Sequence, residues 1–449
     1  MYVSVNPFNH QKLAEYPPDA YPDVELSQSA YLYWRNLSLT ARLEKLQKLA
    51  DVLRKNRAEY ARLITLEMGK PLRESLYEID KTLTAFDYYG EHAEKFLAPR
   101  FITTNASRSY VRYDPLGIIF CIMPWNFPFW QVFRFALPAL AAGNVIILKH
   151  APNVPQCAAA IENAFKLAGF ADGIFKNYYL THQDAAALLA DERIAGLSFT
   201  GSDTTGSLLA SLAGKHIKKC VMELGGNDAF IVLEDADLPL TIAGAVKSRS
   251  INTGQACNGA KRFLVTEPIA TAFVDGLIAA VRELKQGDPL HEATQISPLA
   301  RRDLADKVEQ QVRDTIAKGA IPHYGDSTFT GKGNFVTPVV LTNVPQNSTA
   351  FCDEIFGPVW SVTVVKNASE AVKLANQTRY GLAASVWTKN IALAEKLAVD
   401  LDAGNVFINE IVKSDPRMPF GGIKRSGFGR ELSEEGIKEF VNVKSVFIR

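Results

Sequence analysis

The stretch GIIFCIMPWNFPFWQVFRFALPALAAGNVIILK (residues 117–149) contains an apolar strand, an apolar helix and a second apolar strand in succession. Similar short apolar runs alternate with helical stretches as far as residue 222. This alternation is typical of right-handed βαβ units, which build a parallel sheet covered by helices. The same pattern resumes from residue 228 to 410 and predicts a second α/β domain.

The segments outside these two regions predict helices near the N-terminus and an extended arm. Apolar residues recur every three or four positions over residues 26–70 and again over about 73–97. FITTNASRSYVRYDPLG (residues 101–117) has the pattern of a hairpin or arm, and the C-terminal FVNVKSVFIR predicts one strand. We therefore expect a first domain of residues 1–98 and 115–222, and a second domain of residues 223–429. Residues 99–114 and 430–449 are expected to form an arm.

The composition is that of a globular protein with balanced charge. Lys and Arg number 49 against 48 Asp and Glu, and the net charge of +1 argues against a nucleic-acid-binding protein. The five cysteines form no CxxC pair and have no metal-ligand spacing, so we predict no metal site and a reducing compartment, the cytoplasm. We expect no signal peptide and no membrane span, because the longest apolar stretch is broken by Pro138, Gly143 and Asn144.

Three segments carry candidate catalytic residues. Cys257 lies among small and polar residues in NTGQACNGAKRF, whereas Cys121 and Cys220 lie in apolar strands, as structural cysteines usually do. Glu223 precedes two glycines in MELGGND, and Asn126 lies between two prolines in PWNFP. Taken singly, the cysteine could be a core residue, the glutamate a surface charge and the asparagine a turn residue.

Together these segments resemble the aldehyde dehydrogenase superfamily. PWNFP, FTGS, ELGGN, GQACNGAKR, EIFGPV and PFGGIKRSGFGRE occur in the family's order, and Glu223 precedes Cys257 by 34 residues, as in the family. The resemblance extends from about residue 20 to the end of the chain. It implies the aldehyde dehydrogenase fold, in which a Rossmann-like cofactor domain (here 1–98 and 115–222) joins an α/β catalytic domain and a small β oligomerisation arm.

The resemblance also implies a reaction. Cys257 is expected to attack the aldehyde carbon as a thiolate, and the Asn126 amide and the Cys257 backbone N–H to hold the oxyanion. Glu223 is expected to activate the water that hydrolyses the thioester. Members that use CoA instead of water generally lack this glutamate, so a free acid product is expected.

On the cofactor side the chain has no GxGxxG, the usual dinucleotide-binding pattern. The family uses a different turn, here FTGSDTTG, in which the start of a helix faces the pyrophosphate. Pro152 replaces the glutamate that many NAD-preferring members carry three residues after a ribose-binding lysine, so we expect NAD or NADP. The resemblance implies cofactor contacts by Trp125, Lys149, Gly201, Ser202, Gly206, Leu224, Glu354 and Phe356.

Arg134, in the apolar helix WQVFRFALPAL, bears on the choice of aldehyde. It is a helix-end charge or one half of a structural ion pair, or else, as in the succinate-semialdehyde dehydrogenases, a ligand of the substrate's carboxylate. LKHAPNVP and PFWQVFR are also similar to one bacterial subgroup of those enzymes, and we favour the substrate interpretation. Two family features are missing: Ile251 replaces a second carboxylate-binding arginine, with Arg249 nearby, and Gly259 replaces a redox-switch cysteine.

We therefore expect NAD(P)-dependent oxidation of succinate semialdehyde to succinate by a homodimer or homotetramer, with no nucleic-acid or membrane partner. The arm and the last strand are expected to pair with a neighbouring subunit. Two alternatives stay open. One is a broad-specificity dehydrogenase of short-chain aldehydes, and the other is a catalytically silent structural or binding protein on the same scaffold.

Overall fold

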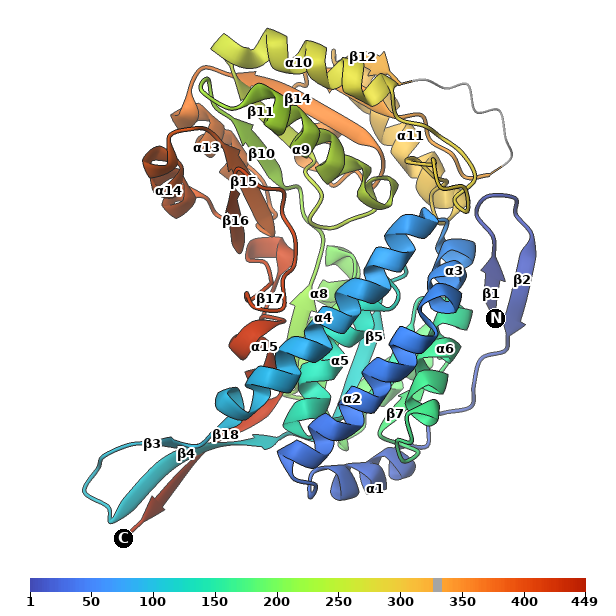
Figure 1. The fold of residues 1–449 in the computed structure, drawn as a ribbon, viewed down its shortest axis with the longest axis vertical. Coiled ribbons are helices and arrows are strands. Elements are labelled where there is room, and N and C mark those ends of the chain that lie inside the picture. The colour runs from blue at the N-terminus through green and yellow to red at the C-terminus, as the bar shows by residue number, and fades with distance from the viewer. Residues whose placement is uncertain (326–332) are drawn as a thin grey trace.

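The computed structural model describes residues 1–325 and 333–449, which form two helix-covered sheets and an arm (Figure 1). The first sheet has six strands in the order β17-β9-β8-β5-β6-β7, all parallel except β17. Its strands are β5 (Ile118–Met123), β6 (Val145–His150), β7 (Phe175–Asn177), β8 (Ile194–Thr200), β9 (Lys219–Glu223) and β17 (Gly427–Phe428). Every residue of β6 is buried because helices cover both faces of a parallel sheet.

Helices surround this sheet as the apolar periodicity predicts. The connecting helices are α5 (Trp130–Ala142), α6 (Pro155–Leu167), α7 (His182–Ala190) and α8 (Asp203–Lys215). Helix α5 is buried throughout because α4 (Leu72–Leu97) and α2 (Leu39–Lys55) pack over it. The remaining N-terminal helices are α1 (Val24–Trp34) and α3 (Arg57–Met68), and a hairpin of β1 (Tyr2–Val5) and β2 (Lys12–Tyr16) precedes them.

The second sheet has seven strands in the order β12-β13-β14-β11-β10-β15-β16, parallel except for β12. They are β10 (Ala229–Val232), β11 (Arg262–Thr266), β12 (Ile321–Tyr324), β13 (Val339–Thr342), β14 (Val359–Val365), β15 (Ala383–Trp387) and β16 (Asn405–Ile408). Its helices are α9 (Leu238–Ser250), α10 (Glu267–Arg282), α11 (Arg302–Ala317), α12 (Thr349–Cys352), α13 (Ala368–Asn376) and α14 (Ile391–Asp400).

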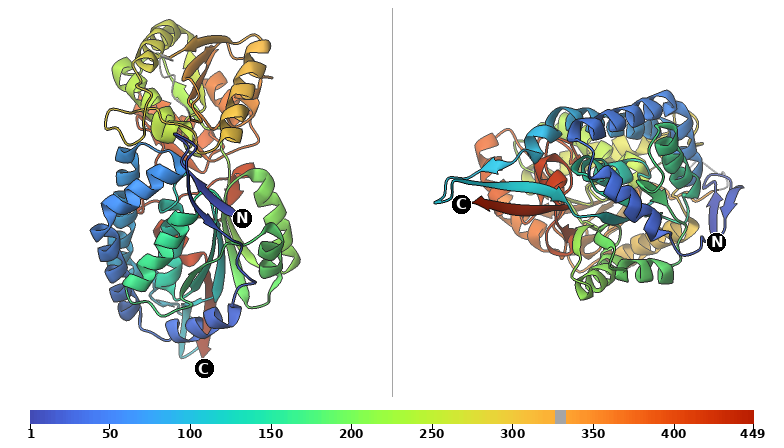
Figure 2. Two further views of the ribbon diagram at one scale, coloured as in Figure 1. Left: turned by 90° about the vertical axis from the view of Figure 1, so that its right-hand side faces the viewer. Right: turned by 90° about the horizontal axis from the view of Figure 1, so that it is seen from below.

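The arm is a three-stranded antiparallel sheet that projects from the first domain (Figure 2). It consists of β3 (Arg100–Phe101), β4 (Arg108–Pro115) and β18 (Val441–Ile448), in the order β18-β4-β3. Short α15 (Ser433–Lys438) precedes β18 and packs on α4 and α5. Strand β17 falls within the range predicted for the second domain, yet it pairs with β9 of the first sheet.

Among the described residues, no helix is both long and apolar enough to cross a lipid bilayer.

Candidate active site

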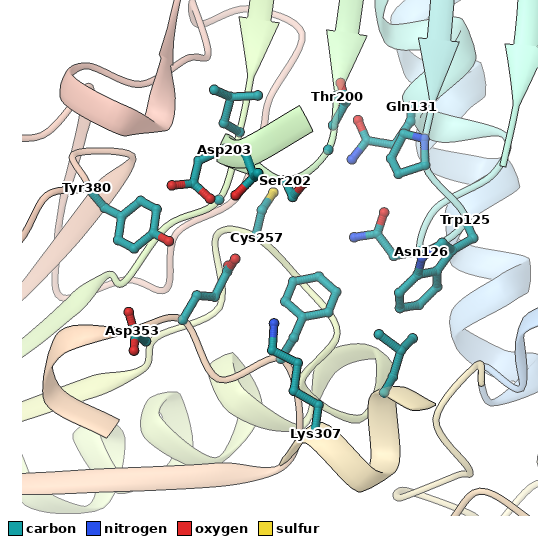
Figure 3. Close-up of a pocket in the computed structure, with 18 of the residues that line it drawn as sticks. Trp125, Asn126, Gln131, Thr200, Ser202, Asp203, Cys257, Lys307, Asp353 and Tyr380 are labelled. Carbon is teal, nitrogen blue, oxygen red and sulfur yellow. The ribbon is translucent and has the colours of Figure 1, made fainter. Parts of the chain in front are cut away.

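A cavity of about 590 Å³ lies where β5, β8 and β9 of the first sheet end (Figure 3). Its opposite wall comes from α11 and from the loop before β14. Ligands of open parallel sheets bind beyond the carboxyl ends of the strands, so the position is that of a cofactor cleft. Cys257 lines this cavity, and Figure 3 shows its sulfur between the side chains of Asn126 and Tyr380.

Cys257 follows a strained turn, the 3₁₀ segment η1 (Ile251–Gly254). Asn252 and Thr253 adopt positive φ angles of 52° and 53°, which non-glycine residues rarely do. Two groups hold the turn. Glu74 of α4 accepts a hydrogen bond of 2.6 Å from the Asn252 N–H, and buried Arg249 donates to the Gly254 carbonyl at 3.0 Å.

The guanidinium of Arg249 is occupied by backbone carbonyls. Its guanidinium also donates to the carbonyl of Gly357 at 2.9 Å and to that of Ile355 at 2.5 Å. These contacts tie the end of α9 to the loop before β14. Because these carbonyls occupy its guanidinium, Arg249 does not replace the second carboxylate-binding arginine, whose position in the chain is occupied by Ile251.

Asn126 lies beside the nucleophile, in the turn between β5 and α5. Its Nδ2 donates to the Gln255 carbonyl at 3.0 Å, and its own carbonyl accepts from Asn252 Nδ2 at 2.8 Å. A side-chain amide nitrogen carries two hydrogens, so one remains after the Gln255 contact. The flanking prolines restrict the turn, and the amide is fixed next to Cys257.

Cys257 is partly exposed to the cavity, and protein atoms crowd its thiol. Burial raises its pKa to about 11, while the charges of Arg134 and Lys261 favour the thiolate. Lys261 is itself held in place: its Nζ donates to the Cys257 carbonyl and to the Ala256 carbonyl at 3.2 Å, and lies 3.3 Å from Glu354. Burial thus favours the thiol, and the two cations favour the thiolate that a nucleophilic cysteine needs.

The loop between β8 and α8 forms one wall of the cavity. Ser202 caps α8, accepting a hydrogen bond of 3.3 Å from the Thr205 N–H, and Gly201 and Ser202 both line the cavity. The first N–H groups of a helix and its dipole favour a phosphate at this end. Gly206 lies one turn further along α8. Its backbone is so close to Leu224 that a Cβ at this position would come within 2.4 Å of the Leu224 side chain.

The opposite wall holds Glu354 and Phe356. Glu354 Oε1 accepts a hydrogen bond of 3.2 Å from the Gly226 N–H, and a Cβ on Gly225 would lie 2.6 Å from Glu354 Oε2. The Phe356 ring lies edge-on to Trp125, with centroids 5.9 Å apart. An acidic side chain and two aromatic rings suit the ribose and ring of a nicotinamide nucleotide.

Unused hydrogen-bonding groups also mark this cavity as a ligand site. Thr200 Oγ1, Gln131 Oε1 and Asn126 Oδ1 belong to residues that line it, are buried, and have no hydrogen-bond partner within residues 1–325 and 333–449. Buried polar atoms normally have partners. The residues present therefore fit a polar cofactor.

Two of the predicted cofactor residues do not line this cavity. Gly206 packs behind the wall, and Lys149, at the end of β6, is buried with its Nζ 5.7 Å from the Tyr2 ring. Burial lowers the pKa of Lys149. The other six, Trp125, Gly201, Ser202, Leu224, Glu354 and Phe356, all line it.

Arg134 and Glu223 meet in a second, buried cluster. The Arg134 guanidinium pairs with Glu431 through Nε and lies 4.0 Å from Glu223 Oε2 through Nη2. All three side chains are at most 3% exposed. Burial and the neighbouring Glu431 carboxylate raise the pKa of Glu223 well above its ordinary value, while Arg134 opposes the shift.

The surroundings of Arg134 bear on both interpretations of this residue. Its guanidinium lies opposite Glu431 and Glu223 and over the Phe420 ring at 5.1 Å, as in a structural ion pair. Its Nη2 has no hydrogen-bond partner within the described residues, and its role as a ligand of a substrate carboxylate stays a prediction. Sequence analysis missed Glu431, although it ends the motif PFGGIKRSGFGRE.

The chain belongs to the aldehyde dehydrogenase family, whose family model matches residues 1–446. The predicted fold class is confirmed, since aldehyde dehydrogenase structures superpose over the whole chain with TM-scores of 0.95 to 0.97. The protein is thus an NAD(P)-dependent enzyme of this family.

Relatives can be named more closely. The chain is 46% identical over 450 residues to a probable succinate-semialdehyde dehydrogenase [NADP(+)] of Synechocystis sp., with 99% of both chains covered. It is 42% identical to a succinate semialdehyde dehydrogenase [NAD(P)+] of Escherichia coli, covering 99% of this chain and 97% of that one. A succinic semialdehyde dehydrogenase of Streptococcus pyogenes, in complex with NADP+, is 34% identical and superposes with a TM-score of 0.96 over all of both chains.

Proposed function

We propose that this protein oxidises succinate semialdehyde to succinate with NAD+ or NADP+. The observation that carries the proposal is the position of Cys257, which lines the cofactor cavity next to Asn126 in a chain that matches succinate-semialdehyde dehydrogenases over nearly its full length. Retention of Cys257, Asn126 and Glu223 argues against the catalytically silent alternative.

The first step is attack of Cys257 Sγ on the aldehyde carbon, which forms a carbon–sulfur bond and an oxyanion. Arg134 and Lys261 favour the thiolate that makes this attack. The remaining Asn126 Nδ2 hydrogen and the Cys257 N–H hold the oxyanion, and each such donor is worth about 10²–10³ in rate. A nicotinamide nucleotide held by Trp125, Glu354 and Phe356 would supply the acceptor for the hydride of the substrate carbon.

Hydrolysis of the resulting Cys257 thioester needs a base. Glu223 takes a proton from water, and the water oxygen attacks the thioester carbon, which releases succinate and the Cys257 thiol. The raised pKa of Glu223 makes its carboxylate a stronger proton acceptor, as a general base requires. Arg134 balances the charge of Glu223 and Glu431 while this proton is transferred.

Steady-state formation of NADH and NADPH with succinate semialdehyde, butyraldehyde and glutaraldehyde tests the proposal. Butyraldehyde has the same carbon chain without the carboxylate, so kcat/KM for the semialdehyde should exceed it clearly. Equal values would favour the broad-specificity alternative. Absence of turnover with all three aldehydes would favour a silent scaffold.

We further propose a homodimer or homotetramer that works in the cytoplasm. Strand β18 is the outer strand of the arm, and Val443 and Phe447 on it are 59% and 60% exposed. Pairing of this edge with a second copy would cover these side chains. Light scattering on the purified protein measures the assembly, and Val443→Lys should weaken it.

A further inference from the structure

The backbone before Cys257 runs through three consecutive residues in the left-handed region. The φ angles of Asn252, Thr253 and Gly254 are 52°, 53° and 79°. Residues other than glycine disfavour this region, so neighbouring groups have to hold the turn. One of these groups is the carboxylate of Glu74, in the first turn of α4.

Glu74 contacts the turn through a single strong hydrogen bond. Its Oε2 accepts from the Asn252 N–H at 2.6 Å, and a carboxylate is a stronger acceptor than a neutral oxygen. Burial raises the pKa of Glu74, while this hydrogen bond and the charges of Lys70 and Arg73 oppose the shift. Glu74 is not among the described residues that line the cofactor cavity. The carboxylate thus contacts the turn rather than the cavity.

Asn252 connects this contact to Asn126. Its Nδ2 donates to the Asn126 carbonyl at 2.8 Å and to the Gln255 carbonyl at 3.2 Å. Asn126 Nδ2 donates to the same Gln255 carbonyl at 3.0 Å, two residues before Cys257. A shift of Asn252 would therefore move the Asn126 amide relative to the sulfur.

Helix α4 also fixes the other end of the Asn126 turn. Glu78 lies one turn after Glu74. Its Oε1 accepts hydrogen bonds of 2.8 and 3.0 Å from the N–H groups of Phe129 and Trp130, at the start of α5. The two carboxylates thus hold the loop of the nucleophile and the start of α5 against one helix.

These contacts matter because the two reacting groups come from different sheets. Asn126 follows β5 of the first sheet, whereas Cys257 precedes β11 of the second. Their relative position is therefore set by contacts between the two parts of the chain, and not by either sheet alone. An error of about 1 Å in such a position can cost about 10²-fold in rate.

We propose that Glu74 is a positioning residue, which acts through Asn252 to hold the Asn126 amide at the place where the oxyanion forms. The inference rests on the proposed function. Glu74 makes no contact with the substrate in this role, so it should affect charged and neutral aldehydes alike. Its effect should appear in the transition state, where the oxyanion is present, and not in the binding of aldehyde or cofactor.

Glu74→Ala removes the acceptor for the Asn252 N–H. We expect kcat and kcat/KM to fall by the same factor, about 10- to 100-fold, for both succinate semialdehyde and butyraldehyde. KM and the affinity for NADP+ should change less than about threefold. Glu74→Gln keeps a side-chain oxygen as acceptor and should restore activity to within about fivefold of the wild type. Glu94→Ala, at an exposed position of the same helix, is the matched control and should leave both substrates unchanged.

A double-mutant cycle with Asn126→Ala separates positioning from support of the fold. In the Asn126→Ala background, Glu74→Ala should lower kcat less than about threefold further, because no amide remains to be positioned. If Glu74→Ala lowers kcat by the same factor in both backgrounds, or keeps wild-type activity, the assignment of Glu74 is wrong and the proposed function stands. Glu74→Asp, which moves the acceptor and keeps its charge, takes its place in the cycle if Glu74→Ala does not fold. If the wild type oxidises neither aldehyde, the proposed function itself fails.

Discussion

The cofactor cavity and the cluster of Arg134, Glu223 and Glu431 both lie near Cys257, but they are built differently. The cavity is lined by short, contiguous segments, such as Gly201 and Ser202 at the start of α8, and it retains unused polar atoms. The cluster brings together Arg134 of α5, Glu223 at the end of β9 and Glu431, which follows β17, and its opposite charges lie close together. Buried polar atoms without a hydrogen-bond partner occur in both, and in the cluster they include Arg134 Nη2 and Glu223 Oε1. The cluster differs from the cavity in that opposite charges balance one another within the protein.

Cys257→Ser tests whether the cavity works independently of the chemistry. Dehydrogenase activity should fall by roughly 10⁴-fold or more, because a serine hydroxyl is a far weaker nucleophile at neutral pH than a thiolate. Binding of NADP+, followed by quenching of the tryptophan fluorescence to which Trp125 in the cavity contributes, should change less than about threefold. Loss of cofactor binding would show that the two functions cannot be separated.

These two regions also differ in how far the sequence predicts them. The cavity wall formed by the loop between β8 and α8 can be predicted from local motifs, because its backbone N–H groups and glycines lie in one short segment of the chain. The role of Arg134 depends on Glu431, far along the chain, and no local pattern shows their packing.

The boundaries between the domains were also only partly predictable from the sequence. The alternation of strands and helices predicts both parallel sheets, because βαβ units are local. The return of β17 to the edge of the first sheet is a long-range pairing of two residues and has no periodic signal. The placement of Lys149 beside Tyr2 of the N-terminal hairpin was likewise not predictable from its motif.

Arg134→Met tests the charge balance in the cluster of Arg134, Glu223 and Glu431. It leaves Glu223 and Glu431 buried without a countercharge, so the free energy of unfolding should fall by about 3–5 kcal/mol. Adding Glu431→Gln should recover much of this loss. Urea unfolding measures both, and Arg54→Met, which breaks an exposed pair with Asp51, should cost less than about 1 kcal/mol.

The same variant should show a defined pH dependence. Without Arg134, the pKa of Glu223 in the folded state lies still further above its ordinary 4.5, so the folded state holds a proton that the unfolded state releases. Stability must then fall as pH rises above about 4.5. A variant that is no less stable at pH 8 than at pH 5 would contradict an uncompensated carboxylate cluster.

Pro152→Glu gives the smallest effect and tests the cofactor side. Pro152 is exposed, three residues after Lys149, at the position where many NAD-preferring members of the family carry a glutamate. Repulsion of about 1 kcal/mol between the new carboxylate and a 2′-phosphate should lower kcat/KM for NADP+ about fivefold relative to NAD+. Pro152→Gln separates loss of the proline ring from gain of the charge and should leave the ratio unchanged. Added salt should weaken the effect of Pro152→Glu, because exposed charges are screened. An equal shift in both variants would show that the backbone at Pro152, and not charge, sets the preference.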